Sequence, residues 1–393
     1  MRRNIFRLGG ALALGTALSL GLAACGGGSG DGSSGGGEAA GTVKVGFLGA
    51  LTGENAGIAI PPHNGAKLAF DEYNKTNPKT KIEYVPYDSQ GLPEQATPLA
   101  TKAVREDKIV AMVGPAFSGE SKNVGPILEE AKVPSVSASA TAVDLAQQGW
   151  KYWHRVVAND GAQGPAAAEF LTRAMKAKKI FIVDDSQEYS AGLADAVDAT
   201  LKGKATVNRD KVDQQGSDYA STVNKIKAFN PDAVFFGGYY AQAGRLLKQL
   251  RQADVQAPFM SGDGSLDAGL IEGAGEANAT DTYIACPCVL GSASDDPEVK
   301  DFAQRYKAAF NADAQIYATE GYDAATAIID AIKAGNTDAE KINEFLKTYS
   351  KKGVSKDIKF APNGELSTSS IFVYAVKGKD YTLLGDSKTA SVQ

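Results

Sequence analysis

One stretch in the first third of the chain limits what the remainder can fold into. Ile109–Val113 is a short apolar run that ends at Gly114-Pro115, as a buried strand ends. Apolar side chains then recur at helical spacing over Ser121–Lys132, and Val133–Val136 is a second apolar run. Strand, helix and strand in this order form a right-handed crossover between parallel strands. The loops after the two strands should therefore lie at the same edge of a sheet.

Both of these loops are rich in hydroxyl groups. The first contains Ser118 and Ser121, and the second contains Ser137, Ser139 and Thr141. Loops at the carboxyl ends of parallel strands lead into helix N-termini, where free backbone N–H groups attract an anion. Because hydroxyl groups donate to a carboxylate without adding charge, the stretch predicts a site for a small acid group. The alternative is that these side chains only cap helices, which Ser and Thr do routinely.

The same alternation of strand and helix extends over most of the chain and predicts an α/β fold. A first series begins at Thr42, and a second series of similar plan begins near Asp160. Each lobe would be a mostly parallel sheet flanked by helices, joined to the other by hinge crossovers, with both sets of loops facing one cleft. We expect lobe 1 to comprise residues 42–159 and 287–366, and lobe 2 to comprise residues 160–286 and 367–393.

The first residues have the layout of a secretory signal. Three arginines within the first seven residues precede an apolar, uncharged segment that is shorter than a typical membrane span. It ends at Leu22-Ala23-Ala24-Cys25, which resembles the lipobox of bacterial lipoproteins, where cleavage before the cysteine follows attachment of a diacylglycerol to its sulfur. We expect a signal peptide over residues 1–24, lipidation at Cys25 and a Gly/Ser-rich tether over residues 25–41. An ordinary signal with an unrelated cysteine is the alternative, and the export route stays open.

Cys286-Pro287-Cys288 is the other notable cysteine pattern. Export would permit a disulfide between these two residues. A structural role, as a disulfide or as paired buried thiols, is favoured over a redox-active pair, because no cation nearby in the sequence would activate a thiol.

Composition and motifs argue against several classes of function. The formal net charge is −5 and no basic stripe occurs, which argues against a nucleic-acid partner. The sequence has only two histidines, His63 and His154. From Thr42 onward it contains no G-x-S-x-G, H-E-x-x-H, C-x₂-C or G-x₄-G-K-[ST] motif. We therefore expect no catalytic residue, no metal site and no cofactor, and an exported hydrolase is the weaker alternative.

Seven short segments, taken together, resemble a known family. In order, they are Lys44–Gly53, Val113–Ser118, Ser137–Thr141, Arg155–Pro165, Tyr189–Ala194, Phe236–Tyr240 and Phe259–Asp263. Their order and spacing resemble the branched-chain amino-acid-binding proteins of ABC importers (the leucine/isoleucine/valine-binding family), which have the type I periplasmic-binding-protein fold. The resemblance extends essentially from Thr42 to the C-terminus and implies a two-lobed protein that closes over its ligand.

The resemblance also implies roles for individual residues in the first lobe. The hydroxyl groups of Ser118 and Thr141, with backbone N–H groups near Ser139 and Thr141 (a stretch that includes Ala140), would hold the α-carboxylate of the ligand. The Ser139 carbonyl group and Thr141 would help to hold the α-ammonium group, and Phe117 would form a wall of the side-chain pocket.

In the second lobe, the resemblance implies that Tyr189 and Tyr239 close over the ligand and that Asp263 pairs with the ammonium group. Glu is familiar in the family where Asp263 stands. Each assignment has an alternative: Asp263, between two glycines, is a common turn residue, and the tyrosines could pack at an interface. Asp160 is interpreted as a hinge or helix-cap residue rather than a ligand contact.

These observations predict a lipid-anchored, extracytoplasmic protein that captures an amino acid in the cleft and delivers it to an ABC transporter permease. Leu, Ile and Val are the leading ligands by resemblance. The alternative ligands are an amide, urea or an aromatic acid. The alternative function is that of a ligand-sensing module. We expect a monomer. Losing Asp263 should abolish most binding because a buried ammonium group needs a partner, while the melting temperature of the free protein should stay near that of the wild type.

Overall fold

The structure is a computed structural model that describes residues 41–392, which belong to one compact unit. The expected signal peptide, the lipidation site Cys25 and nearly all of the expected tether lie outside the described residues. Gly41, the last residue assigned to the tether, already begins the first strand.

The first sheet is parallel throughout. Within residues 41–392 it has five strands in the order β2-β1-β3-β4-β5. Their bounds are β1 (Gly41–Gly49), β2 (Thr80–Asp88), β3 (Ala111–Val113), β4 (Ser135–Ser137) and β5 (Trp153–Arg155). The three strands from β3 to β5 are buried at every residue, as expected of parallel strands with both faces covered.

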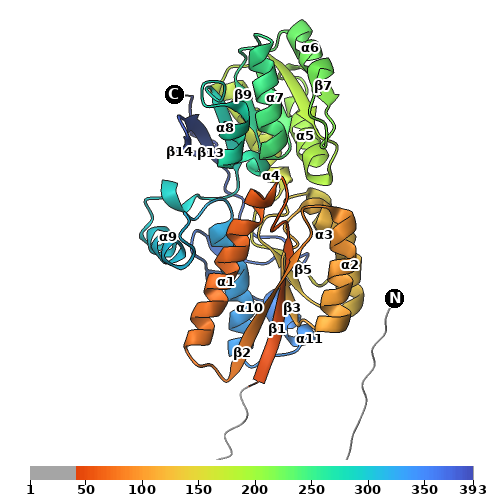
Figure 1. Cartoon of the computed structure of the whole chain (residues 1–393), viewed down its shortest axis with the longest axis vertical. Helices are drawn as coiled ribbons and strands as arrows, with labels where there is room; N and C mark the ends of the chain where they lie inside the picture. The colour runs from red at the N-terminus through yellow and green to blue at the C-terminus, as the bar shows by residue number, and fades with distance from the viewer. Residues whose placement is uncertain (1–40, 393) are drawn as a thin grey trace, which may run out of the picture. The chain divides into compact units, whose positions relative to one another are not determined.

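Helices from two distant parts of the chain cover this sheet (Figure 1). Early helices are α1 (Ile60–Lys75), α2 (Pro93–Lys102) and α3 (Ser118–Ala131), and late helices are α10 (Ala318–Lys333) and α11 (Ala339–Lys347). Helix α9 (Pro297–Phe310) packs against α1 at the side of this layer. Helix α10, from the late part of the chain, packs against α1, β3 and β4. The exact residue boundaries of the two lobes stay a prediction.

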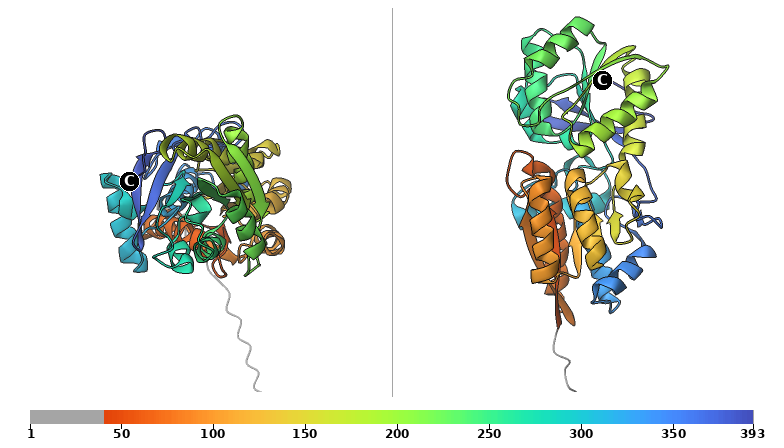
Figure 2. Two further views of the ribbon diagram at one scale, coloured as in Figure 1. Left: turned by 90° about the horizontal axis from the view of Figure 1, so that it is seen from above. Right: turned by 90° about the vertical axis from the view of Figure 1, so that its right-hand side faces the viewer.

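The second sheet is mixed. In the described part of the chain it has seven strands in the order β14-β13-β10-β9-β8-β6-β7. Strands β6 to β10 pair in parallel, whereas β13 pairs in antiparallel fashion with both β10 and β14. The strands are β6 (Lys179–Asp184), β7 (Thr206–Lys211), β8 (Ala233–Gly237), β9 (Phe259–Ser261), β10 (Thr282–Cys286), β13 (Phe372–Lys377) and β14 (Asp380–Asp386). Its helices are α4 (Asp160–Glu169), α5 (Glu188–Leu201), α6 (Ala220–Phe229), α7 (Tyr240–Gln252) and α8 (Ala268–Ala274). Two mostly parallel sheets flanked by helices confirm the fold class (Figures 1 and 2).

Two local features differ from the sequence-based expectation. The Pro61-Pro62 pair in the sequence is typical of a loop, but helix α1 begins at Ile60 and contains both prolines. The first turn of a helix tolerates proline because its N–H groups have no intrahelical acceptor. A small antiparallel pair, β11 (Ser350–Lys352) and β12 (Asp357–Lys359), was not expected, because its residues carry no strong strand pattern.

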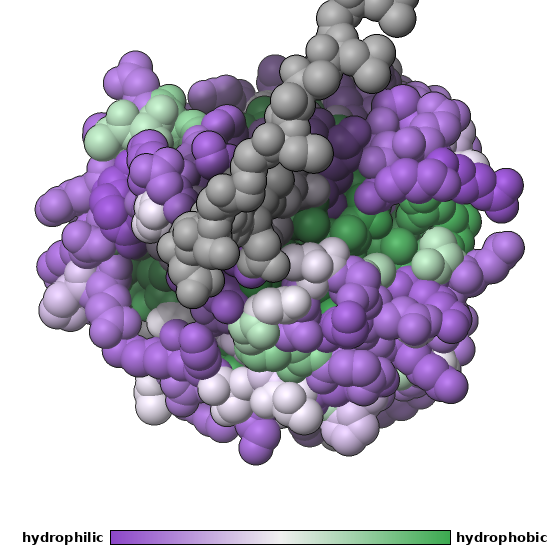
Figure 3. Space-filling model, turned by 90° about the horizontal axis from the view of Figure 1, so that it is seen from below, coloured by the Kyte–Doolittle hydropathy of each residue, from purple (hydrophilic) through white to green (hydrophobic). Residues whose placement is uncertain are grey.

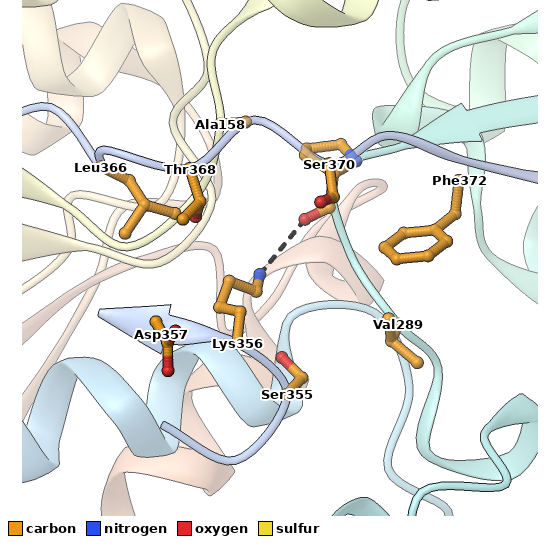
Figure 4. A pocket seen from close by; sticks show the side chains of 10 residues that line it. Ala158, Val289, Ser355, Lys356, Asp357, Leu366, Thr368, Ser370 and Phe372 are labelled. Atoms are coloured by element: carbon orange, nitrogen blue, oxygen red, sulfur yellow. Dashed lines mark hydrogen bonds between the residues drawn. The ribbon is translucent and has the colours of Figure 1, made fainter. Parts of the chain in front are cut away.

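Within residues 41–392 the chain passes between the two sheets three times, after β5, after β10 and before β13. One cavity of about 260 Å³ is lined by residues from all three crossings, including Ala158, Val289 and Ser370 (Figure 4). Inside it, Lys356 Nζ donates to the backbone oxygen of Pro287 at 3.2 Å. The crossings therefore lie side by side, as a hinge between two lobes requires.

Cys286 and Cys288 form a disulfide at the second crossing, which is one of the two structural roles that the sequence left open. Both cysteines are fully buried. The face of the molecule seen in Figure 3 is mainly hydrophilic, with hydrophobic residues in small patches. None of the helices between residues 41 and 392 is long and apolar enough to cross a membrane.

Candidate functional site

The candidate site lies where loops after the strands of the first sheet meet loops after the strands of the second. Two cavities, of about 310 and 180 Å³, are lined from both sides. Phe117 from the first sheet's loops and Tyr239 from the second sheet's loops line both cavities, and their rings lie 5.2 Å apart. Tyr189 lines the larger cavity and lies 5.2 Å from the Tyr239 ring. The three aromatic side chains expected at the cleft are therefore brought together.

The two hydroxyl-rich loops of the first sheet are held against each other, as predicted. Ser137 Oγ donates to the Pro115 carbonyl oxygen at 2.7 Å, and Ser139 Oγ donates to the Ala116 carbonyl oxygen at 2.7 Å. Ser118 Oγ accepts from the backbone N–H of Ala142 at 3.2 Å. These three hydroxyl groups are therefore already used in joining the loops, and Ser118 is the first residue of α3 rather than its cap.

Thr141 differs from these serines. Its side chain is fully buried and lies next to the Asp160 carboxyl group, which begins helix α4. Neither Thr141 Oγ1 nor Asp160 Oδ2 makes a hydrogen bond of normal geometry with the described residues. Because buried polar atoms are almost always paired, these two oxygens are the best candidates for ligand contacts on this side of the site. The cap of α4 is Asn159, whose side chain accepts from Gly161, so the interpretation of Asp160 as a cap is wrong.

Asp263 lies at the centre of a buried hydrogen-bond cluster. Its side chain is 3% exposed. Oδ1 accepts from Gln163 Nε2 at 2.6 Å and from the Tyr189 hydroxyl at 2.8 Å, and Oδ2 accepts from the Tyr317 hydroxyl. Burial raises the pKa of Asp263, and the bonds from Tyr317, Gln163 and Tyr189 offset part of that rise. Asp263 is thus an organised buried acceptor and not only a turn residue.

Two members of this cluster were not assigned a role from the sequence. Tyr317 precedes α10 in a left-handed conformation (φ 61°) and brings a late segment of the chain to Asp263. Its sequence context resembles an ordinary helix start, so nothing marked it. Gln163 lies in one of the segments that carry the family resemblance, and the structure shows it donating to Asp263 and also to Asp160, at 3.1 Å.

Two ion pairs bridge the sheets near the cavities. Arg245 of α7 pairs with Glu54, in the loop after β1, at 2.5 Å. Lys122 of α3 pairs with Glu188 of α5 at 2.6 Å. Both pairs are partly exposed, so each contributes little to stability, but each joins one lobe to the other.

The comparisons with known proteins agree with this architecture. Residues 42–380 match the family model described as periplasmic binding protein, so the chain belongs to the periplasmic binding protein family. The resemblance inferred from the seven segments is thereby confirmed, and the family indicates an extracytoplasmic location.

Individual relatives are similar over most of their length. A leucine-, isoleucine-, valine-, threonine- and alanine-binding protein of Pseudomonas aeruginosa is 29% identical, with 86% of this chain and 90% of the relative covered. The crystal structure of a leucine binding protein, LivK, from Thermotoga maritima is 28% identical with a TM-score of 0.81, covering 88% of this chain and 98% of that one. A solute binding protein of an ABC transporter from R. palustris, solved with benzoate, shares the fold (TM-score 0.79, 20% identity, 90% and 98% covered).

Proposed function

We propose that this protein captures an amino acid between its two lobes and delivers it to an ABC transporter permease. One observation carries the proposal: a buried carboxylate, Asp263, is held by donors from several elements directly beside the loops that carry Thr141. A carboxylate in that position suits an α-ammonium group, and a neutral loop rich in N–H groups suits an α-carboxylate. Relatives that bind amino acids support the same conclusion.

The residue roles follow from this geometry. Asp263 binds the ammonium group, while the hydroxyl and backbone N–H groups of Thr141 bind the carboxylate group. The backbone N–H groups of Ser139 and Ala140 donate to Ser137 Oγ and thereby fix the loop that carries Thr141. Tyr189 and Tyr239 cover the ligand from the second lobe. Phe117 contacts the ligand side chain, and Ser118 acts mainly by fixing the loop that contains Ala142. No chemistry is performed on the ligand, so the protein is a binding protein and not an enzyme.

The first test is calorimetric titration of residues 42–393, freed of bound ligand by unfolding and refolding. The titrants are the twenty amino acids, a set of amides and a set of aromatic acids. Amides are included because Gln187, Gln214 and Gln215 line the cavities. Submicromolar binding of Leu, Ile or Val without turnover is the expected result. Tight binding of an aromatic acid alone would retain the fold and overturn the ligand class.

The lipid anchor is a separate part of the proposal. Cys25, followed by the Gly/Ser-rich tether, would hold the protein at the outer face of the cell membrane and leave the binding unit free to turn. Cys25→Ser should move the protein from the membrane fraction to the soluble extracytoplasmic fraction. A variant that still sediments with membranes would contradict the anchor without affecting the ligand proposal.

A further inference from the structure

Two buried carboxyl groups in the site share one hydrogen-bond donor. Gln163 Nε2 donates to Asp160 Oδ1 at 3.1 Å and to Asp263 Oδ1 at 2.6 Å. Both carboxyl groups are buried, and the second oxygen of Asp160 makes no hydrogen bond of normal geometry within the described residues. The hydroxyl of Thr141, which also lacks a bond of normal geometry, lies beside it and is close enough to favour its ionised form. The structure therefore holds a second acidic group next to the proposed ammonium site, with Thr141 as the donor nearest to its second oxygen.

The charged and titratable groups that face Asp160 do not neutralise this pair. Arg155 of β5 is the nearest cation, but its guanidinium group forms two hydrogen bonds to Glu365. Its remaining bonds reach the carbonyl oxygens of Ala140 and Ala142, each at 2.9 Å. The other groups that face Asp160 are Asp263 itself and the hydroxyl groups of two tyrosines, Tyr189 of α5 and Tyr239 before α7.

Two adjacent buried carboxylates without their own cation cannot both stay ionised at neutral pH. Burial, and after it the charge of Asp263, raises the pKa of Asp160 well above its usual range. Asp263, in contrast, accepts hydrogen bonds from Tyr317, Gln163 and Tyr189, and these bonds favour its ionised form. In the ligand-free protein the pair should therefore carry one proton, held on Asp160.

We propose that Asp160 is a second ligand-binding carboxyl group, which is protonated in the empty site and loses its proton to solvent when an ammonium group binds beside Asp263. The charges balance: the free pair has one negative charge, and the complex has two carboxylates, one ligand ammonium group and one proton released to the buffer. This inference rests on the proposed function, because it requires a ligand with an ammonium group. It also predicts that affinity rises with pH while the ligand stays a zwitterion.

The experiment is calorimetric titration of the wild-type protein with the best-bound amino acid in phosphate and in Tris, whose ionisation enthalpies differ. The dependence of the measured heat on the buffer gives the number of protons exchanged. We expect the release of about one proton at pH 7, and a dissociation constant that falls up to about tenfold per pH unit. Asp160→Asn, which preserves shape and the acceptor for Gln163, should abolish both effects.

Glu120→Gln is the matched control. Burial raises the pKa of Glu120 to about 7, and its carboxyl group accepts from the Phe117 N–H, so it is another buried group near the site that could supply a proton. This variant should retain the full proton release. Wild-type binding without proton release would overturn the inference, as would release that persists in Asp160→Asn or disappears in Glu120→Gln.

An infrared measurement covers the case in which Asp160→Asn fails to fold or bind. The free wild-type protein should show the carbonyl band of a protonated carboxyl group that disappears on ligand binding. A free protein without such a band would overturn the inference. Failure of every amino acid to bind would refute the proposed function, whereas binding without proton release refutes only the role of Asp160.

Discussion

Replacing Asp263 by alanine should reduce stability as well as binding. From the sequence alone, we expected the melting temperature of the free protein to stay near that of the wild type. The structure shows instead that three buried side chains, Gln163, Tyr189 and Tyr317, donate hydrogen bonds to this carboxylate. Asp263→Ala leaves the two tyrosine hydroxyl groups without this acceptor, whereas Gln163 still donates to Asp160.

The magnitude follows from the two tyrosine bonds. A buried donor left unpaired costs about 1–3 kcal/mol. Water entering the space left by the carboxylate would compensate part of this cost, so we take about 1 kcal/mol for each tyrosine and expect a loss of about 2 kcal/mol in the free energy of unfolding. Loss of the ammonium partner should also reduce affinity by about 2–5 kcal/mol, which is about thirtyfold or more.

Urea unfolding of the ligand-free protein measures the first quantity and calorimetric titration the second. Glu130→Ala, an exposed carboxylate on α3, is the control and should change stability by less than about 0.5 kcal/mol. If the free energy of unfolding of Asp263→Ala differs from that of the wild type by less than about 0.5 kcal/mol, the hydrogen-bond cluster is not what stabilises this part of the protein. Unchanged affinity would remove Asp263 from the binding site.

Three further outcomes are expected from other parts of the structure. Glu54→Gln should weaken ligand binding by less than about fivefold, because the ion pair of Glu54 with Arg245 is partly exposed. Salt screens this ion pair, so the loss of affinity should be smaller still at high salt. A hundredfold loss of affinity by calorimetry would contradict this expectation. Burial lowers the pKa of His154 to about 4, so its neutral form contributes stability above pH 6.5 that is lost as the pH falls towards 4. The loss in unfolding free energy between pH 7 and pH 4 should therefore be about 3 kcal/mol smaller in His154→Phe than in the wild type, and equal losses in urea titrations would refute the assignment. Gly262→Ala would place a methyl group 2.3 Å from Leu193 Cδ2 and 2.6 Å from the Tyr189 hydroxyl oxygen, and should cost about 1–3 kcal/mol in thermal unfolding. A stability equal to that of the wild type would show that both side chains can move away freely.

Much of the fold could be predicted because its strands and helices have distinct patterns. The short apolar runs before Gly114 and before Ser137 indicated parallel strands, and the chain direction then placed their loops at one edge. The start of α1 at Ile60 could not be predicted, because prolines suit both a loop and the first turn of a helix. The strand β11 is exposed along its whole length, so it lacks the alternation that marks a half-buried strand.

The candidate site was predicted less completely than the fold. Residues of the hydroxyl-rich loops were found, but their local spacing could not show that Ser139 bonds to Ala116 while Thr141 stays unpaired. Tyr317 was missed because it reaches Asp263 from a segment 54 residues further along the chain. Such contacts depend on packing between distant elements, and no local periodicity records them. Asp160 was interpreted as a hinge or helix-cap residue, and the cap part of that interpretation was wrong because the adjacent Asn159, which has the same preference, caps the helix.

The pairing of β13 with β10 has a consequence for how the protein is made. Strand β10 reads Thr-Tyr-Ile-Ala-Cys and is buried along its whole length, and its outer side is covered by Phe372–Lys377 near the end of the chain. Until that late segment arrives, β10 presents a row of open N–H and C=O groups on an uncharged strand, which is a template for pairing with another molecule. A growing or truncated chain that stops before Phe372 would thus be prone to self-association. Strand β13 therefore protects the edge of β10 from pairing with another molecule.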